Sequence, residues 1–587
     1  METQERLVLP DRDSGRVPRD VVLIVLLGAL LIFPSFFTRN LWNPDEPRYM
    51  ELTREMVVLH DYVVPHLNGQ WHPDKPPLFM WSGVGFYKLG FGLLSCRMAS
   101  GLATLGTLLL VYFFGRRLYG AKAGRLAALA TATTFLFTEI SKDGVADTLI
   151  TFLETGAILA AYLAMNGKTE RARLWWLAFY AGCGLAVLCK GPVGMFTPGV
   201  FVLVYALFNR KAIRRGGWMH AAGAALMLII IFAWLVPAMI RGGAAYSRDI
   251  LFHQQAVYTI QPVSHVHGPH YYLMQLPLYL FPWVFFFGLA LADALIAWRR
   301  RLDRDAAFLA LWFVCILAFF SIIPAKRERY LLPMIPAVGL LCARYWTLTA
   351  ASAVRWPKLQ RWFGMVTFCL IALMGVGVLL FPWVAPHVFA GSFRGEPDLR
   401  ATVLEIVRSN SMKAMIPFGA LCLVLSAIGI NRGVLKNRQA WLIGALVAAV
   451  ACLSLLGDFV LYPAFDPMKS GKAFCAQILP YLNKSDRKYM YGNDYAGLIN
   501  LHTGITSIPL IEAPGKPDAA ALLEVFQLPA RIAVISDQAR ILPLLKQLPK
   551  GVRIAVSERI GHRGMVLLCN WEDPAGQAPR EVAPPGG

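Results

Sequence analysis

The sequence predicts an all-α polytopic membrane protein with a small α/β domain at its C-terminal end. Of the 587 residues, 56% are hydrophobic and only 16% are charged, and the mean hydropathy is +0.50, far above that of soluble proteins. Apolar runs long enough to cross a bilayer recur up to residue 462 and then stop. The basic residues are also distributed unevenly between the segments that join these runs.

The apolar runs predict about thirteen transmembrane helices. A helix needs roughly 20 apolar residues to cross about 30 Å of hydrocarbon, and several of the runs are short or touch their neighbours. We place them at 21–37, 98–115, 126–140, 148–165, 174–189, 192–208, 219–240, 271–297, 306–324, 331–349, 363–386, 414–430 and 440–462. The first run follows Arg16 and Arg19 without a small-residue cleavage site, so it predicts an uncleaved helix.

Lysine and arginine predict the orientation of these helices. With residues 1–20 in the cytoplasm, the cytoplasmic segments contain about one basic residue in three, and the external segments before residue 463 contain about one in eight. An odd number of helices then places the C-terminus outside. The net charge of +21 fits cytoplasmic loops that face anionic lipid, and it does not indicate a nucleic-acid partner.

Residues 21–462 are therefore predicted to form the membrane domain, with long external loops at 38–97 and 241–270. Residues 463–573 contain no spanning run and are predicted to form a soluble external α/β domain. Its expected strands include 531–535 and 551–556, and its expected helices include 519–527 and 537–547. The Pro/Gly-rich segment 574–587 is predicted to be disordered.

The ten cysteines do not indicate a metal site. Eight of them lie in apolar stretches, where cysteine is most simply a small core residue, and the sequence contains no C-x-x-C. Only Cys475 and Cys569 fall in polar sequence. A disulfide between these two is an open alternative, because spacing fixes no geometry.

Acidic residues at two external helix ends are candidates for catalysis. Asp45 and Glu46 follow the first membrane helix, and a helix beginning near Pro47 would place Asp45 at its positive N-terminal end, close to Arg48. A helix cap is the simpler interpretation of a single aspartate. However, Asp147 adds a second carboxylate where the fourth apolar run begins, and ionisable groups at that depth are functional candidates.

Several basic residues on the external side run against the charge bias. Lys75 lies between Asp74 and two prolines, Lys190 precedes Gly191-Pro192, and three cations occur within 326–330. A lysine held by prolines is suited to contact a phosphate, although each lysine alone could simply extend to the membrane surface. Together they predict a pocket for an anionic group at the outer leaflet.

These motifs resemble those of the polyprenyl-phosphate-dependent membrane glycosyltransferases with the GT-C fold. The resemblance rests on five segments in order: Asp-Glu-x-Arg-Tyr at 45–49, Lys-Pro-Pro-Leu at 75–78, Asp147 before Thr-Leu-x-Thr-Phe, Lys190-Gly191-Pro192, and Lys326 with Tyr330-Leu-Leu-Pro. Thirteen spans and an external C-terminal domain look most like the lipid A aminoarabinose transferases. The protein O-mannosyltransferases are more distant relatives.

The resemblance implies an inverting glycosyltransferase in the bacterial inner membrane. Its donor would be a sugar, expected to be 4-amino-4-deoxy-L-arabinose, on undecaprenyl phosphate, and its acceptor would be lipid A at the periplasmic face. Carried over by position, Asp45, Asp147 and Glu46 are the catalytic candidates. The candidate contacts of the donor phosphate are Lys75, Arg48, Tyr330, Lys326 and Lys190. We expect a monomer.

The sequence departs from the family pattern at two places. Asp74 stands where the family usually has Glu, and His253 is followed by Gln254-Gln255-Ala256, where the aminoarabinose transferases tend to carry an Arg. Asp74 and His253 are the candidate ligands of a divalent metal, although no cofactor is required by the sequence.

Two other functions are compatible with the same features. One is a protein O-mannosyltransferase-like enzyme that acts on Ser or Thr. The other is a transporter or flippase of a lipid-linked sugar, which should carry charges or helix breaks near the bilayer midplane. Here nearly all candidate charges lie toward one face, which favours the enzyme, and no nucleotide-binding motif indicates an energy-driven pump.

Overall fold

The computed structural model describes residues 17–167, 170–209, 216–253, 265–300, 302–350, 355–390, 397–492, 495–513, 516–561 and 563–572. The chain divides into two compact units. The first unit comprises Met1–Thr38, Pro73–Phe79 and Arg97–Tyr462. The second comprises Arg39–His72, Met80–Cys96 and Pro463–Gly587. The predicted tail at 574–587 lies outside the described residues.

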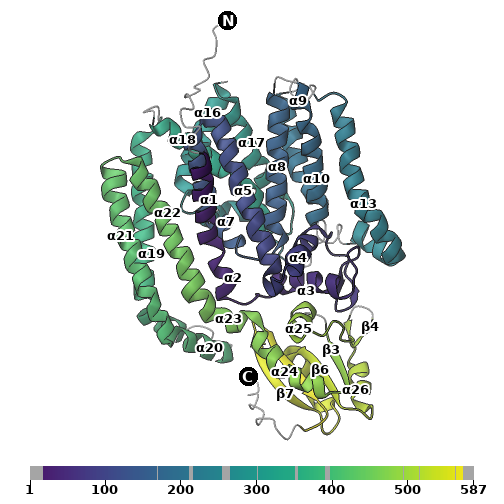
Figure 1. The fold of residues 1–587 in the computed structure, drawn as a ribbon. Helices are drawn as coiled ribbons and strands as arrows, with labels where there is room; N and C mark the ends of the chain where they lie inside the picture. The colour runs from purple at the N-terminus through teal and green to yellow at the C-terminus, as the bar shows by residue number, and fades with distance from the viewer. Residues whose placement is uncertain are drawn as a thin grey trace. The chain divides into compact units, whose positions relative to one another are not determined.

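The first unit is a bundle of apolar helices (Figure 1). Its earlier helices are α1 (Val17–Ile32), α2 (Pro34–Thr38), α5 (Ser95–Tyr119), α6 (Ala121–Ala132), α7 (Phe135–Ile140), α8 (Ala146–Asn166), α9 (Glu170–Arg173), α10 (Trp175–Lys190), α11 (Val193–Phe208) and α13 (Met219–Arg248), followed by the π-helix η3 (Asp249–His253). Its later helices are α15 (Tyr271–Tyr279), α16 (Val284–Arg299), α17 (Arg304–Ile322), η4 (Glu328–Met334), α18 (Ile335–Ala350), α19 (Pro357–Ala390), α20 (Pro397–Arg408), η5 (Asn410–Ala414), α21 (Met415–Ile428), η6 (Gly429–Leu435), α22 (Gln439–Leu456) and η7 (Gly457–Leu461).

The predicted fold class is confirmed, but the predicted number of spans is not decided. Within the described residues, nine helical segments are long and apolar enough to cross a membrane. The pair α15 and α16, bent by 115°, makes a tenth if it is one span. The apolar helices α10 and α11 have 16 residues each, and α6 has 12. The count of thirteen includes these three shorter helices, so it stays a prediction.

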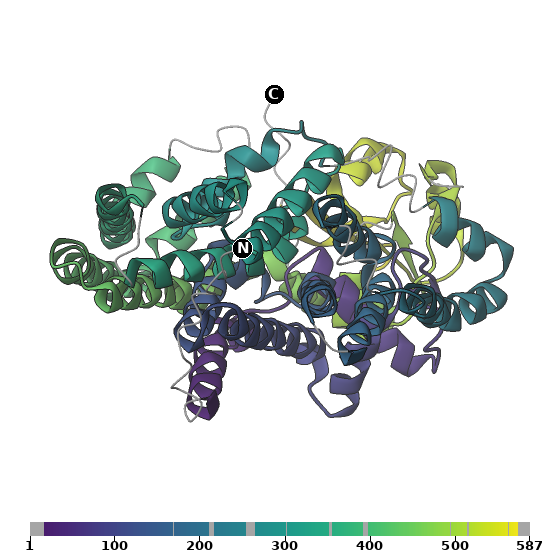
Figure 2. The same cartoon turned by 90° about the horizontal axis from the view of Figure 1, so that it is seen from above.

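Small residues let the helices of the first unit pack closely. At Gly339 of α18, an added Cβ would lie 2.1 Å from Thr131 Oγ1 and 2.7 Å from the Ala127 carbonyl oxygen of α6. Only glycine permits this approach, so α18 and α6 lie in direct contact. Helix α10 packs between α8 and α13, while α19, α21 and α22 pack together on the opposite side of the bundle (Figure 2).

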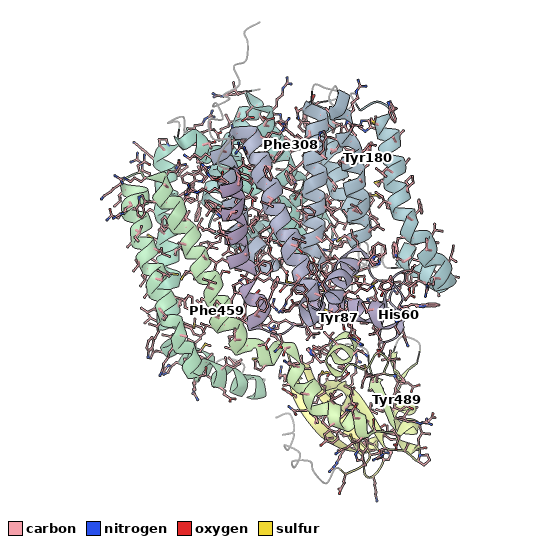
Figure 3. The ribbon with its side chains drawn as sticks, in the orientation of Figure 1. His60, Tyr87, Tyr180, Phe308, Phe459 and Tyr489 are labelled. Atoms are coloured by element: carbon pink, nitrogen blue, oxygen red, sulfur yellow. The ribbon has the colours of Figure 1, made fainter. Side chains whose placement is uncertain are left out.

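Aromatic rings and a network of ion pairs join the helices at one end of the bundle. Phe308 of α17, labelled in Figure 3, packs edge-on against Tyr162 and Phe201, with ring centroids 5.0 and 4.8 Å apart. At the same end of α17, Arg344 donates from Nε to Asp303 Oδ2 and from Nη1 to Asp293 Oδ2, both at 2.7 Å. Asp303 also caps α17 by accepting the Ala306 amide.

The second unit contains a four-stranded sheet in the order β3-β6-β8-β7. Strands β3 and β6 are parallel, with Arg487 opposite Ile532, and the other two pairs are antiparallel. The strands are β3 (Arg487–Tyr491), β6 (Ile532–Asp537), β7 (Arg553–Ile560) and β8 (Arg563–Cys569). The helices of this unit are α3 (Asp45–Val58), α4 (Leu78–Lys88), η2 (Gly92–Leu94), α23 (Tyr462–Ser470), α24 (Lys472–Lys484), α25 (Ala496–Thr503), α26 (Ala519–Gln527), α27 (Gln538–Ile541) and η8 (Leu542–Gln547). Two short hairpins pair β1 (His66–Leu67) with β2 (Gln70–Trp71) and β4 (Glu512–Ala513) with β5 (Lys516–Pro517).

Helices cover both faces of this sheet. Side chains alternate along a strand, so Ala533 and Ile535 of β6 face one core while Ile532 and Val534 face the other. Helices α24 and α25 fill the first core, and α26 and α27 fill the second. The strands expected at 531–535 and 551–556 correspond to β6 and β7, and the helices expected at 519–527 and 537–547 correspond to α26 and to α27 with η8.

The possible disulfide of the second unit is not formed. Cys475 and Cys569 are both fully buried in the same core, and both are free thiols. Each therefore acts as a small apolar core residue.

Candidate functional site

Asp147 lies in the first turn of α8 and is 3% exposed. The chain before it is fixed by Ser100 Oγ, which donates to the Val145 carbonyl oxygen at 3.0 Å and accepts the Val145 amide at 3.1 Å. The positive end of the helix dipole stabilises a negative charge at this position. These contacts fix the backbone before Asp147, so its carboxylate lies at the N-terminus of a membrane helix.

Two cations flank the Asp147 carboxylate. Lys190 Nζ donates to its Oδ1, and Arg329 Nη1 lies 4.0 Å from its Oδ2. Lys190 is the last residue of α10, which ends because Gly191 adopts a φ of 84°, a value that favours glycine. Arg329 comes from η4. Residues far apart in sequence therefore place two positive charges against the Asp147 carboxylate, and Arg329 Nε also lies 3.9 Å from Oε1 of the partly exposed Glu328.

Tyr330 completes this cluster. Lys190 Nζ lies 4.8 Å from the centroid of its ring, which packs in turn against Phe320 at 5.5 Å. Three predicted site residues, Asp147, Lys190 and Tyr330, are thus brought together. Arg329 was missed as an individual site residue, although it belongs to the basic segment before Tyr330.

Lys326 lies in a different setting from the one expected. Its side chain is buried, and Nζ donates to the carbonyl oxygens of Phe320, Ser321 and Ile323 at 3.3, 2.9 and 2.5 Å. These carbonyls lie at the end of α17, where cations stabilise the last turn. Because an ammonium has three donors, Lys326 would have to give up these bonds to bind a phosphate. We therefore assign it to the support of η4.

Asp74 and Lys75 form an ion pair in the segment Pro73–Phe79 of the first unit, with Nζ 3.0 Å from Asp74 Oδ1. Lys75 keeps 23% of its side chain exposed, whereas Asp74 keeps 6%. The backbone of His253 ends η3, and its side chain lies outside the described residues. Among the side chains described, no group of three His, Cys, Asp or Glu could hold a metal. A metal at Asp74 and His253 stays a prediction.

The other predicted acidic residues belong to the second unit. Asp45 begins α3, is 7% exposed, and accepts a bond of 2.6 Å from Arg48 Nη2. Glu46 Oε2 accepts from Arg39 Nη1 at 2.7 Å and from the Trp42 amide at 3.0 Å. Glu46 therefore holds the chain that enters α3. Arg39, its partner, was not recognised from the sequence.

A further carboxylate, Glu154, was also missed because it lies within an apolar run. It is 1% exposed on α8, two turns beyond Asp147, and Thr197 of α11 donates to its Oε1 at 2.5 Å. Its Oε2 has no hydrogen-bond partner among the described residues.

Comparison with solved structures identifies the fold of the chain. The chain superimposes on the crystal structure of ArnT from Cupriavidus metallidurans bound to undecaprenyl phosphate with a TM-score of 0.76, covering 96% of this chain and 100% of that one at 21% identity. The apo structure of the same protein gives a TM-score of 0.75. The chain has the GT-C fold.

Sequence comparisons agree with this GT-C-fold assignment. Residues 74–236 match the family model described as dolichyl-phosphate-mannose-protein mannosyltransferase. The undecaprenyl phosphate-alpha-4-amino-4-deoxy-L-arabinose arabinosyl transferase of Pectobacterium carotovorum subsp. carotovorum is 28% identical over 387 residues, 64% of this chain and 68% of that protein. Its counterpart from Pseudomonas aeruginosa (strain LESB58) is 30% identical over 324 residues, 54% of this chain and 58% of that protein. The resemblance inferred from the five motifs is confirmed.

Proposed function

We propose that this chain transfers 4-amino-4-deoxy-L-arabinose from undecaprenyl phosphate to lipid A at the periplasmic face of the bacterial inner membrane. The relatives above are named for this donor, and the GT-C fold is shared with ArnT along nearly the whole chain. The observation that carries the proposal is the cluster of Lys190, Arg329 and Tyr330 around Asp147. Two cations held at helix ends suit a site for a phosphate.

The reaction needs positive charge at the donor phosphate. A sugar joined through phosphate to a prenyl chain has a stable leaving group, so transfer depends on stabilising the negative charge of the departing phosphate. Lys190 and Arg329 supply donors from fixed helix ends, and Lys75, partly exposed beside Asp74, is a third candidate. Asp147 keeps the two flanking cations in place before the donor binds.

Transfer also needs a base for the acceptor oxygen. Asp45 is our candidate, because it is a nearly buried carboxylate at the start of α3 that pairs with Arg48 at 2.6 Å. Direct displacement with Asp45 as base inverts the anomeric centre, whereas a double displacement would require a carboxylate that attacks that carbon. Glu46 supports Asp45 by anchoring the chain before α3 to Arg39.

The test is a transfer assay with purified protein and radiolabelled undecaprenyl-phosphate aminoarabinose. We expect label on lipid A, and none on a Ser/Thr peptide. The control is the Asp147→Asn variant under the same conditions. Movement of intact donor across a liposome membrane without transfer to lipid A would contradict the proposal and indicate a flippase.

Protein O-mannosylation is the second candidate, because the matched family model is a mannosyltransferase of proteins. The same assay with polyprenyl-phosphate mannose distinguishes it. Label on the peptide, with none on lipid A, would favour this alternative.

The orientation proposed from the charge bias places the N-terminus in the cytoplasm and the C-terminus in the periplasm. A reporter that is active only in the periplasm should therefore be active when it is fused after residue 470. Activity of a cytoplasm-specific reporter at that position would contradict this topology.

A further inference from the structure

A deep groove runs between four helices of the first unit, α1, α6, α21 and α22. Its volume is about 790 Å³. Nearly all of its wall is apolar, formed by leucines of α1, α6 and α21 and by small or branched residues of α22. No member of the Asp147 cluster lines it. The groove is therefore a separate feature from the proposed catalytic site.

Small residues on one side of α22 create the hollow. Ala440, Gly444, Ala448 and Ala451 recur at helical spacing along the wall. A Cβ added at Gly444 would meet nothing within 4 Å, so this space is unfilled by protein. The lining residues of α22 extend from Gln439 to Leu455, about 24 Å at the rise of an α-helix. This length exceeds the thickness of one leaflet, which is half of a hydrocarbon core of about 30 Å.

One end of the groove is cationic. Lys122 and Arg125 of α6 line it there, with Gln439 at the start of α22. Arg125 Nη1 pairs with Asp20 Oδ2 at 2.9 Å, and this carboxylate is buried. Lys122 Nζ donates to Gln439 Oε1 at 2.9 Å, and within the described residues no carboxylate lies at ion-pair distance from it. Two cations and one carboxylate leave a net positive charge.

We propose that this groove binds one anionic phospholipid of the surrounding bilayer. Its phosphate contacts the remaining donors of Lys122, and an acyl chain lies along the small residues of α22. The charge favours an anionic headgroup, because basic pockets between membrane helices on the cytoplasmic side bind such headgroups. The apolar length favours a lipid over a soluble anion. This inference does not rest on the proposed sugar transfer, since the groove shares no residue with that site.

The lipid would contact both walls of the groove. Helices α21 and α22 form one wall, and α1 and α6 form the other. Filling the space restores van der Waals contacts that an empty hollow lacks. We therefore expect bound lipid to raise the thermal stability of the protein.

Two variants test the proposal with phosphatidylglycerol and phosphatidylcholine as probes, in full-length protein that has been delipidated in detergent. Lys122→Glu reverses the charge without removing the Arg125–Asp20 pair. Gly444→Leu adds a side chain to the hollow at a position where an added Cβ meets nothing within 4 Å. The matched controls are Lys358→Glu, an exposed lysine outside the lining, and Gly377→Leu on α19, where an added Cβ also meets nothing within 4 Å.

Native mass spectrometry measures the retained lipid. We expect unaltered protein and both controls to retain one phosphatidylglycerol in preference to phosphatidylcholine. Lys122→Glu should weaken phosphatidylglycerol retention by about fivefold or more, the scale of one basic residue near a lipid surface. Gly444→Leu should lose it, and added phosphatidylglycerol should no longer raise its melting temperature.

Three results would overturn the proposal. They are equal retention of the two phospholipids, unchanged retention in both groove variants, and displacement of phosphatidylglycerol from the groove by equimolar undecaprenyl phosphate. The last would make the groove a second site for the prenyl carrier. None of these results depends on transferase activity, so they leave the proposed function to its own test.

Discussion

The two ends of α17 hold ion clusters of different geometry. Before its first turn, Arg344 lies between two carboxylates, Asp293 and Asp303, at 2.7 Å from each. Beyond its last turn, in η4, Arg329 joins Lys190 around one carboxylate, Asp147. Each cluster also holds a longer ion pair, from Arg355 to Asp293 in the first and from Arg329 to Glu328 in the second, both at 3.9 Å, so each contains two cations and two carboxylates. The clusters differ in the closeness of their contacts, because Arg344 makes two hydrogen bonds of 2.7 Å whereas Arg329 lies 4.0 and 3.9 Å from its two carboxylates.

This difference separates a structural cluster from a candidate binding site. Arg344 can bond both carboxylates through its planar guanidinium. Asp303 also caps α17, so this cluster stabilises the start of that helix. At Asp147 the ion pairs of Arg329 are 4.0 and 3.9 Å long, so an incoming anion competes with weaker contacts there than at Arg344. The closeness of the contacts, rather than the ratio of charges, distinguishes the two ends.

The largest expected effect on stability comes from breaking the first cluster. Arg344→Met leaves two carboxylates near each other without the cation that bonds both at 2.7 Å, and it should cost about 3 kcal/mol of folding free energy. A melting curve in detergent measures the loss. The kcat/KM of the folded fraction should stay within about twofold, and the exposed Arg361→Met serves as control. A large fall in kcat/KM at an unchanged melting temperature would contradict the structural role.

The largest expected effect on chemistry comes from Asp45, where one carboxylate faces one arginine at 2.6 Å. Asp45→Asn keeps the shape of the side chain and removes its charge and basicity. Transfer should fall by about 10²-fold or more, the scale for losing a general base. Donor binding and the melting temperature should be nearly unchanged. A folded variant that transfers at the normal rate would remove Asp45 from the mechanism and make Asp147 the next candidate base.

Asp147→Asn tests the second cluster directly. Losing the carboxylate frees two cations that it holds in place, so we expect transfer to fall by about 10- to 10²-fold. Asp303→Asn is the matched control at the other end of α17, because asparagine can still cap the helix. The control should keep its kcat/KM. Equal losses of activity in both variants would contradict the distinction between the two clusters.

Lys190→Ala and Lys75→Ala should each weaken use of the prenyl donor by about tenfold in kcat/KM, as expected for one lost charge-assisted contact of roughly 1.5–3 kcal/mol. The affected substrate should be the donor, with the KM for lipid A unchanged. Lys358→Ala, an exposed lysine outside the cluster, is the control. Normal donor kinetics in either variant would exclude that lysine from the phosphate site.

The smallest expected effect concerns α3, where Arg54 lies beside two carboxylates, Glu51 and Glu55. Arg54 pairs with Glu51 through two bonds of 2.7 Å, and Glu55 accepts the amides of Asn68 and Gly69. Burial first, and then the charge of Glu51, raise the pKa of the Glu55 carboxyl to about 8.

A raised carboxyl pKa stabilises the folded state most below the unfolded value of about 4.5, and this stability is lost as the pH rises toward 8. The melting temperature should therefore fall by a few degrees between pH 5 and pH 8. Glu55→Gln, which cannot ionise, should flatten this dependence. The same slope in Glu55→Gln and in unaltered protein would contradict a role for Glu55.

The sequence alone determined the fold class and the residue types of the site. Hydrophobic runs of bilayer length are a local property that needs no tertiary information, and the helices appear where these runs lie. Asp147 was recognised because an ionisable residue beside an apolar run is unusual. The five motifs also indicated the glycosyltransferase resemblance that the comparisons confirmed.

The tertiary structure decided the partners of these residues. Lys190 and Arg329 lie 43 and 182 positions from Asp147 in the chain, and only the packing of α8, α10 and η4 brings their charges together. Lys326 has the same charge and lies three residues from Arg329, but its ammonium turns to the carbonyls of α17. Sequence specifies which groups carry charge. The direction in which a side chain points depends on the helix ends and carbonyls around it, so the structure was needed to separate a candidate phosphate contact from a lysine that caps a helix.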